Sequence, residues 1–181
     1  VVGGGHAGVE AAAASARAGA RTLLVSPDLS RIGQMSCNPA IGGVAKGVVA
    51  REVDALGGVM GQATDASRIQ FRMLNRSKGP AVWGPRAQCD RSMYPVAVRR
   101  VLDSLPMLDL FQDMVAGLLV DTGRVVGVRT KGGLEFTGSR LVITTGTFLR
   151  GRIHVGGAAG VEAGRAGEAP SVELAKGLEG L

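Results

Sequence analysis

One stretch decides the fold of this chain, Val1-Val2-Gly3-Gly4-Gly5-His6-Ala7-Gly8. Its two valines end a strand, and the pattern G-x-G-x-x-G follows at Gly3, Gly5 and Gly8. Residues 9–18 are almost all alanine or other helix formers, so the pattern stands between a strand and a helix, as a dinucleotide fingerprint requires. Gly3 permits the tight turn, Gly5 lets the backbone approach a pyrophosphate, and Gly8 lets the helix pack closely on its strand. The stretch favours a bound dinucleotide over a plain glycine turn.

Length and composition limit the class of protein. The 181 residues suffice for one domain with a core, and we expect a fragment cut at both ends, beginning in mid-strand and ending in a helical pattern. The net charge of +6 fits either RNA as a partner or a solvated surface. Two cysteines argue against a disulfide framework and fit a reducing compartment. No apolar run reaches the roughly twenty residues that cross a bilayer.

The first part of the chain is expected to form a Rossmann-like unit, followed by a long segment of loops and helices. Residues 1–26 form a βαβ unit, which predicts a parallel sheet buried on both faces. The segment 27–105 is expected to hold an ordered loop at 28–43, a helix at 44–56, a basic stretch and a helix at 92–104. Spacing predicts one apolar face on the first of these helices, made by Val44, Val48, Val49, Val53 and Leu56.

The second part of the chain changes from the α/β pattern to short strands separated by turns. Residues 107–138 predict a small antiparallel β layer inserted into the nucleotide-binding domain, because glycine turns separate short apolar runs. Its expected strands are 109–120, 124–130 and 134–137. Residues 141–150 return to a buried parallel strand that ends in a turn, and 151–181 begin the next segment.

The usual acidic partner of a ribose is missing from the end of the second strand. Ser26 stands there instead and offers a weaker hydrogen bond, with Asp28 two residues further on. The two histidines have no cysteine, histidine or acid at ligand spacing, so no metal site is predicted. His6 is expected to pack or hydrogen-bond beside the cofactor.

A second informative stretch, residues 33–43, places Cys37 in a loop of Ser, Asn, Pro and glycines that leads to a helix. Helix N–H groups nearby favour the nucleophilic thiolate, although a small buried side chain is the alternative.

A third stretch, residues 75–86, combines cations with Trp83, the only tryptophan. Such a combination binds unpaired nucleotides, and the alternative is a basic loop with the ring tucked beneath it.

With these motifs assembled, the chain resembles the MnmG/GidA family of flavoproteins that modify the wobble uridine of tRNA at carbon 5. The resemblance covers essentially the whole chain. Its distinctive pieces are the glycine turn at 3–8, Gly33–Gly43, Glu52–Gly58, Lys78–Val82 with Arg86–Gln88, Thr145–Leu149, and Gly164–Gly167 running on to Ser171.

The resemblance implies an FAD-binding, glutathione-reductase-like fold with two dinucleotide domains, of which the chain is the N-terminal part. The family reduces its flavin with NADH, at a site beyond residue 181, and takes a one-carbon unit from methylenetetrahydrofolate. It acts on tRNA with a GTPase of the MnmE type, as a homodimer within a heterotetramer. The product carries a carboxymethylaminomethyl or aminomethyl group, and the location is the bacterial cytoplasm or, alternatively, the mitochondrion.

By position, the resemblance also implies site residues. Cys37 matches a cysteine proposed to act in the chemistry, by attacking uridine carbon 6, by protonating an intermediate or by shaping the site. From their charge and composition rather than by position, the basic residues Arg76, Lys78 and Arg86, with Trp83, are expected to contact RNA. The expected FAD contacts are Gly3, Gly4, Gly5, His6, Ala7, Gly8, Val115, Thr145, Gly146, Thr147 and Ser171.

Three rival functions are weighed against this one. The first is a folate- and FAD-dependent tRNA uridine methyltransferase, which lacks the 33–43 loop in this form. The second is a small-molecule flavin oxidoreductase, whose cleft would not need the basic stretch. The third is a non-catalytic RNA-binding fragment that kept the flavin fold and lost its cofactor.

Overall fold

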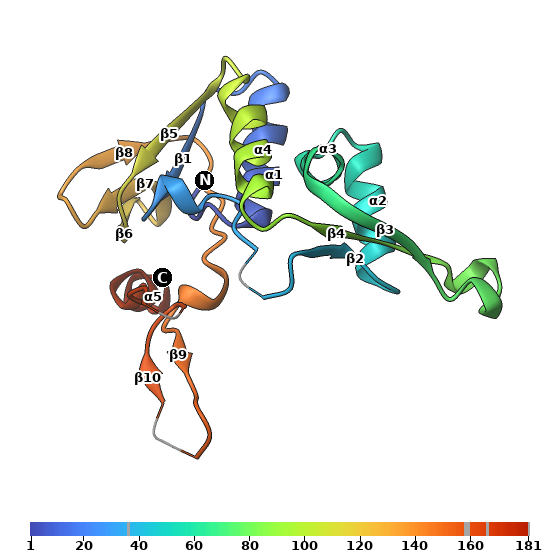
Figure 1. Cartoon of the computed structure of the whole chain (residues 1–181). Coiled ribbons are helices and arrows are strands. Elements are labelled where there is room, and N and C mark those ends of the chain that lie inside the picture. The colour runs from blue at the N-terminus through green and yellow to red at the C-terminus, as the bar shows by residue number, and fades with distance from the viewer. Residues whose placement is uncertain (36, 158–159, 166, 181) are drawn as a thin grey trace. The chain divides into compact units, whose positions relative to one another are not determined.

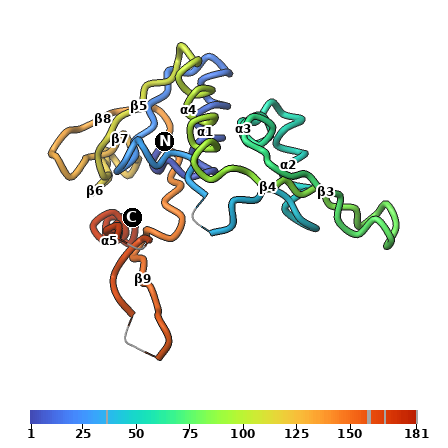
Figure 2. The backbone as a smooth tube through the Cα atoms, viewed as in Figure 1, coloured from blue at the N-terminus to red at the C-terminus, as the bar shows by residue number. Residues whose placement is uncertain are grey.

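A computed structural model describes residues 1–35, 37–157, 160–165 and 167–180. The chain divides into two compact units. The first consists of Val1–Gly8, Leu23–Leu29 and Leu110–Leu181, and the second of Val9–Thr22 and Ser30–Asp109. Figure 2 shows the N-terminus beside the yellow and orange part of the chain, which follows Leu110, although the two are far apart in sequence.

The first unit is built on parallel strand pairing around Val2. On one side Gly3 N donates to Val25 O at 2.9 Å, within β1 (Thr22–Ser26). On the other side Thr144 N donates to Val2 O at 2.8 Å, and Val2 forms parallel bridges with both Val25 and Ile143. Strand β1 pairs in turn with β5 (Leu108–Gln112) (Figure 1). The predicted α/β Rossmann-like fold is confirmed.

An antiparallel sheet forms the second layer of this unit. Its order is β6-β7-β8, with β6 at Val115–Asp121, β7 at Arg124–Thr130 and β8 at Glu135–Thr137. The single strand expected at 109–120 is wrong, because it breaks at Asp113 into β5 and β6. The Asp113 carboxylate accepts a hydrogen bond from Met114 N at 2.7 Å, so the side chain competes with a continuous strand ladder.

The core of the first unit joins both sheets to the last helix. Leu174, on α5 (Val172–Glu179), is buried with Val2, Val25, Val115 and Val128. The rings of Phe111 and Phe136 meet edge to face with centroids 5.0 Å apart. The rest of this unit contributes the 3-10 turn η4 (Gly146–Phe148) and the short pair β9 (Arg152–Ile153) and β10 (Val161–Glu162).

The second unit combines helices with a three-stranded antiparallel sheet of order β2-β4-β3. Its strands are β2 (Ala40–Gly42), β3 (Arg68–Leu74) and β4 (Gly84–Cys89). The helices are α2 (Lys46–Ala55), α3 (Val59–Ser67), α4 (Met93–Asp103) and most of α1 (His6–Arg17). Short 3-10 turns are η1 (Leu29–Arg31), η2 (Arg76–Lys78) and η3 (Pro80–Val82).

Two predictions for this unit need correction. The loop expected at 28–43 contains strand β2, where Gly42 has φ +109° and a Cβ would lie 2.0 Å from Pro85 O. The helix expected at 44–56 is shorter, and its predicted apolar face does not form a core contact in this structure, because Val44, Val48, Val49 and Leu56 are exposed and Val53 is half-buried. Helix α2 instead approaches β4 through Gly47, whose missing side chain allows the close contact with Pro85.

Helix α1 fixes the start of α3 through a carboxylate. Glu10 accepts hydrogen bonds from Val59 N at 2.9 Å and from Met60 N at 2.7 Å. The first N–H groups of a helix have no acceptor inside the helix, so Glu10 satisfies them and complements the positive end of the helix dipole.

Across the described parts of the chain, no helix is both long and apolar enough to cross a membrane.

Candidate functional site: the glycine turn and the residues around it

Thr144 closes the glycine turn from the neighbouring strand. Its hydroxyl lies 2.8 Å from Val2 O and 3.1 Å from Gly3 O, in position to donate to either. Gly3 has φ +103°, and a Cβ there would lie 2.5 Å from Thr144 O. Any side chain at Gly3 would therefore collide with the strand that holds the turn. Sequence reasoning missed Thr144, because its partners lie more than 140 residues away.

Gly8 and Gly5 have opposite surroundings. A Cβ on Gly8 would lie 1.8 Å from Gly3 O and 2.6 Å from the Thr144 hydroxyl, so helix and turn touch through main chain alone. A Cβ on Gly5 would meet no heavy atom within 4 Å, and Gly5 is exposed. The turn is thus closed beneath Gly8 and open above Gly5, which is the shape that a pyrophosphate needs.

Helix α1 begins directly after this opening, so its N-terminus lies at the turn. The helix begins at His6, which is half-buried, while Gly4 is buried and Ala7 is exposed. The first turn of α1, which the structure describes in full, carries no acidic side chain. Helix N–H groups and the helix dipole attract an anion at such an end.

The other expected FAD contacts lie in the same unit as the glycine turn. Thr145 and Gly146 stand at the start of η4, directly after Thr144, and the Thr147 hydroxyl donates to Gly164 O at 3.0 Å. Ser171 is buried and its N donates to Phe148 O at 2.8 Å. Val115 is buried in the core cluster at the start of β6. Their contacts with a cofactor stay predictions.

At the end of β1, the structure places Ser26 and Asp28 as follows. Ser26 is buried, and its hydroxyl donates to Asp28 O at 3.3 Å. Gln112, at the end of the neighbouring β5, accepts a hydrogen bond from Leu29 N at 3.2 Å. The edge therefore offers a carboxamide, a hydroxyl and the half-buried Asp28 for polar contacts.

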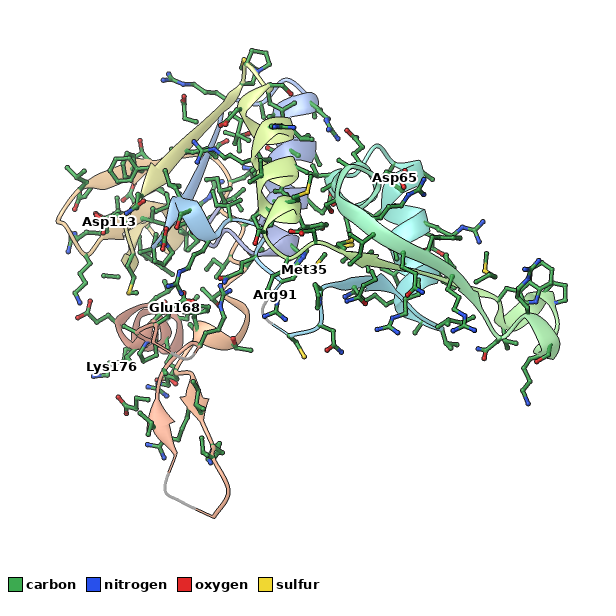
Figure 3. All side chains as sticks on the ribbon, in the orientation of Figure 1. Met35, Asp65, Arg91, Asp113, Glu168 and Lys176 are labelled. Carbon is green, nitrogen blue, oxygen red and sulfur yellow. The ribbon has the colours of Figure 1, made fainter. Side chains whose placement is uncertain are left out.

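Asp113, labelled in Figure 3, organises the turn between the two sheets of the first unit. Its carboxylate accepts from Met114 N and, at 3.2 Å, from Gly132 N. The Thr130 hydroxyl, followed by these two N–H donors, lowers the pKa of Asp113 below its ordinary value of 3.8. Asp113 is a structural carboxylate that sequence reasoning did not single out.

Cys37 lies in the second unit, and its side chain is exposed in this structure. Its main-chain oxygen accepts a hydrogen bond from Arg91 Nη2 at 2.5 Å, which ties the loop to the start of α4 (Figure 3). Ser36, beside it, lies outside the described residues. Cys89 is buried, and this burial raises the pKa of its thiol, so it is the less reactive of the two.

The expected RNA contacts also lie in the second unit, at the connection between β3 and β4. Arg76, Lys78 and Arg86 are exposed. Trp83 is 41% exposed, and its indole N–H donates to Arg76 O at 3.2 Å, so the ring is held but not covered. Within the described residues, no group of three or more His, Cys, Asp or Glu could hold a metal ion.

The parallel strands, the glycine turn and the helix N-terminus define a Rossmann-like α/β protein. More particularly, the model of the family "Glucose inhibited division protein A" (GidA) matches residues 1–181, and the chain belongs to this family. The family-level resemblance drawn from the sequence is thereby confirmed.

Two curated relatives are named tRNA uridine 5-carboxymethylaminomethyl modification enzyme MnmG. The chain is 56% identical over 156 residues to the one from Phocaeicola vulgatus and 61% identical over 158 residues to the one from Salinibacter ruber. Each match covers 86% of this chain but only 25% and 24% of the relative. The chain thus spans about a quarter of the length of these relatives.

Solved structures agree with this placement. GidA from Aquifex aeolicus, in its form II crystal, superposes with a TM-score of 0.92 at 49% identity and covers 98% of this chain and 29% of its own. A GidA-related protein from Thermus thermophilus superposes with a TM-score of 0.66 at 27% identity, over 98% of this chain and 65% of its own.

Proposed function

We propose that the chain is the FAD-binding part of a flavoenzyme that modifies the wobble uridine of tRNA. One observation carries the cofactor assignment: the turn leaves no room for a side chain at Gly3 or Gly8 and leaves open space at Gly5, beside a helix N-terminus. The names of the curated relatives support the reaction assignment.

The residues of the first unit fit FAD in the following way. The main chain at Gly4, Gly5 and His6 would hold the pyrophosphate, while Thr144 and the closed contact beneath Gly8 keep the turn in shape. The strand-end turn at Thr145–Thr147 and the edges at Val115 and Ser171 would meet other parts of the cofactor. When bound, the flavin supplies redox and carbon-transfer chemistry that side chains cannot.

In the complete reaction, we expect NADH as reductant and methylenetetrahydrofolate as the one-carbon donor. A GTPase of the MnmE type would be the partner, and the product would carry an aminomethyl or carboxymethylaminomethyl group at carbon 5. These expectations rest on membership of the family and on the relatives' names. A homodimer in the cytoplasm follows from the same resemblance.

Cys37 is assigned to the activation of uridine. Uracil carbon 5 is a poor nucleophile, and addition of a thiolate at carbon 6 moves the C5–C6 electron pair onto carbon 5. The sulfur–carbon bond breaks again when carbon 5 loses its proton and the double bond reforms. The exposed thiol, on a loop fixed through Arg91, suits this role.

Nucleoside analysis of tRNA tests the proposal. Deleting the gene in its own host should remove the modified wobble uridines and leave 5-methyluridine elsewhere in tRNA unchanged. Loss of 5-methyluridine instead would identify the methyltransferase rival, and unchanged nucleosides would remove both. The purified full-length protein should show flavin absorbance, and a colourless protein that FAD cannot reconstitute would favour the non-catalytic fragment.

A further inference from the structure

The hairpin of the second unit concentrates positive charge. We define the basic ribbon as β3, β4 and the turns between them, residues 68–89, which Figure 1 shows as an extended arm ending in the turns η2 and η3. It contains no Asp or Glu. Its cations are Arg68, Arg72, Arg76, Lys78 and Arg86.

The strand register gathers polar side chains on one face of the ribbon. Arg72 lies directly opposite Arg86, and Gln70 lies directly opposite Gln88. Positions two residues apart share a face, so both pairs stand side by side. Opposed residues have Cβ atoms about 5 Å apart, where like charges destabilise a sheet. The next residue in the Arg86 row, on β2, is Gly42, which has no side chain to cover the arginines.

Neither arginine of this pair is neutralised by a residue that the structure describes. Among the described residues, no carboxylate lies within ion-pair distance of Arg72 or Arg86, and both are exposed. Arg68, at the start of the ribbon, does have a partner, Asp65 at 3.2 Å. On the opposite face, Ile41 and Ala87 are buried, while Phe71, which lies opposite Ala87, is exposed. The two exposed arginines therefore leave their own face open to an anionic partner.

The end of the ribbon adds an aromatic surface. Arg72, Arg76 and Trp83 line an open hollow of about 940 Å³, together with Phe71. Trp83 is fixed by its bond to Arg76 O, and Asn75 Nδ2 donates to Val82 O at 3.3 Å across the same turn. Phe71 is 54% exposed. A fixed, partly exposed ring beside cations is the arrangement that stacks an unpaired base.

We propose that the arginine face of the basic ribbon binds single-stranded RNA, with one phosphate held between Arg72 and Arg86. The Gln70 and Gln88 carboxamides, which both donate and accept, lie in reach of base edges beside that phosphate. Trp83 stacks a base. The combination fits a looped nucleic acid better than an acidic peptide, which would need the cations but neither the ring nor the carboxamides. The inference rests on the proposed function, because it names the surface that holds the tRNA substrate.

The test measures binding of an anticodon stem–loop RNA to the full-length protein over a range of salt concentrations. Arg72→Gln with Arg86→Gln should lower the affinity at least about tenfold at 0.1 M salt. It should also reduce the slope of log affinity against log salt by about 0.7 for each phosphate that the protein no longer neutralises. Trp83→Leu should lower affinity by about tenfold with an unchanged slope, because stacking releases no counterion. Arg124→Gln, an exposed arginine of the first unit, is the matched control and should change neither quantity.

Three results would overturn the inference: an unchanged slope in the double variant, an equal loss in Arg124→Gln, or equal competition by a blunt RNA duplex. Circular dichroism and flavin content of each variant show whether it is folded. The outcomes separate the two proposals. If the double variant shows an unchanged salt slope while the protein still modifies uridine, only the proposed RNA-binding role of the basic ribbon is contradicted. If the double variant shows a reduced salt slope but the protein holds no flavin and modifies no uridine, only the proposed function is contradicted.

Discussion

Substituting Gly8 by alanine tests the glycine turn at its most crowded point. The new Cβ would lie 1.8 Å from Gly3 O, whereas carbon and oxygen normally stay about 3.3 Å apart, so the helix must move by roughly 1.5 Å. Alanine gains about 1 kcal/mol over glycine in helix propensity. Overpacking costs about 1–3 kcal/mol, and the threatened Thr144 hydrogen bond is worth about 1 kcal/mol. The balance is a loss of about 1–3 kcal/mol in the free energy of unfolding.

Gly5→Ala is the matched comparison on the same turn. No heavy atom lies within 4 Å of the new Cβ, so the apo protein should lose less than about 1 kcal/mol, mainly because alanine is a poorer N-cap than glycine. The added methyl group would, however, occupy the space assigned to the pyrophosphate. Losing even one charge-assisted hydrogen bond there should weaken FAD binding at least about tenfold.

Urea unfolding of the apo full-length protein and fluorescence titration with FAD measure the two effects separately. Gly8→Ala should lower stability, and Gly5→Ala should lower FAD affinity while leaving stability nearly intact. The assignment of the two glycines fails if Gly5→Ala binds FAD as tightly as the unchanged protein, or if Gly8→Ala is as stable as the unchanged protein.

Three further substitutions probe single interactions. Thr144→Val should destabilise the apo protein by about 1 kcal/mol and weaken FAD binding, whereas Thr144→Ser should preserve both, as unfolding and FAD titrations will show. Asp113→Asn should be less stable than the unchanged protein at neutral pH, and this difference in the free energy of unfolding should shrink as the pH is lowered. The pKa of Asp113 is lower in the folded state, so its stabilising effect is present above pH 3.8 and is lost as pH falls through the folded value, which thermal unfolding against pH will follow. Cys37→Ala should keep FAD bound but abolish wobble-uridine modification, measured by nucleoside analysis after complementation of the deletion strain.

Each of these has a contrary result. If Thr144→Ser lost as much stability and FAD affinity as Thr144→Val, the hydroxyl of Thr144 would not be the cause of these losses. A gap between Asp113→Asn and the unchanged protein that stays constant down to pH 2 would show that ionisation of Asp113 does not contribute. Full modification by Cys37→Ala would return the exposed thiol to a structural role.

Local signals made the Rossmann-like opening predictable from the sequence. The glycine spacing and the alanine-rich run act within one turn and one helix, and the helices at 44–56 and 92–104 carry periodicity of their own. The β2-β4-β3 sheet was not predictable in the same way. Its strand β2 is only three residues long and runs into Gly42 and Gly43, so it shows no alternation. Strand β3 does alternate polar and apolar residues from Arg68 to Met73, but its arginines favour the interpretation of this segment as a basic stretch alone.

The remaining errors come from contacts between distant residues. The valines of α2 have the spacing of a core face, yet the helix docks through Gly47 and leaves them exposed. Thr144 supports a turn at the other end of the chain, and nothing near it in sequence indicates that role. Asp113 breaks a strand through partners on a turn at Gly132. Such contacts between distant residues cannot be inferred from the sequence and become visible only in the folded structure.

A crystal structure of the full-length protein with FAD tests the role of the glycine turn most directly. We expect pyrophosphate oxygens about 3 Å from main-chain nitrogens of the turn between Gly4 and Gly8, above the open side of Gly5. A cofactor whose phosphates lie on any other part of the chain, or a protein that takes up no FAD at all, would contradict this expectation.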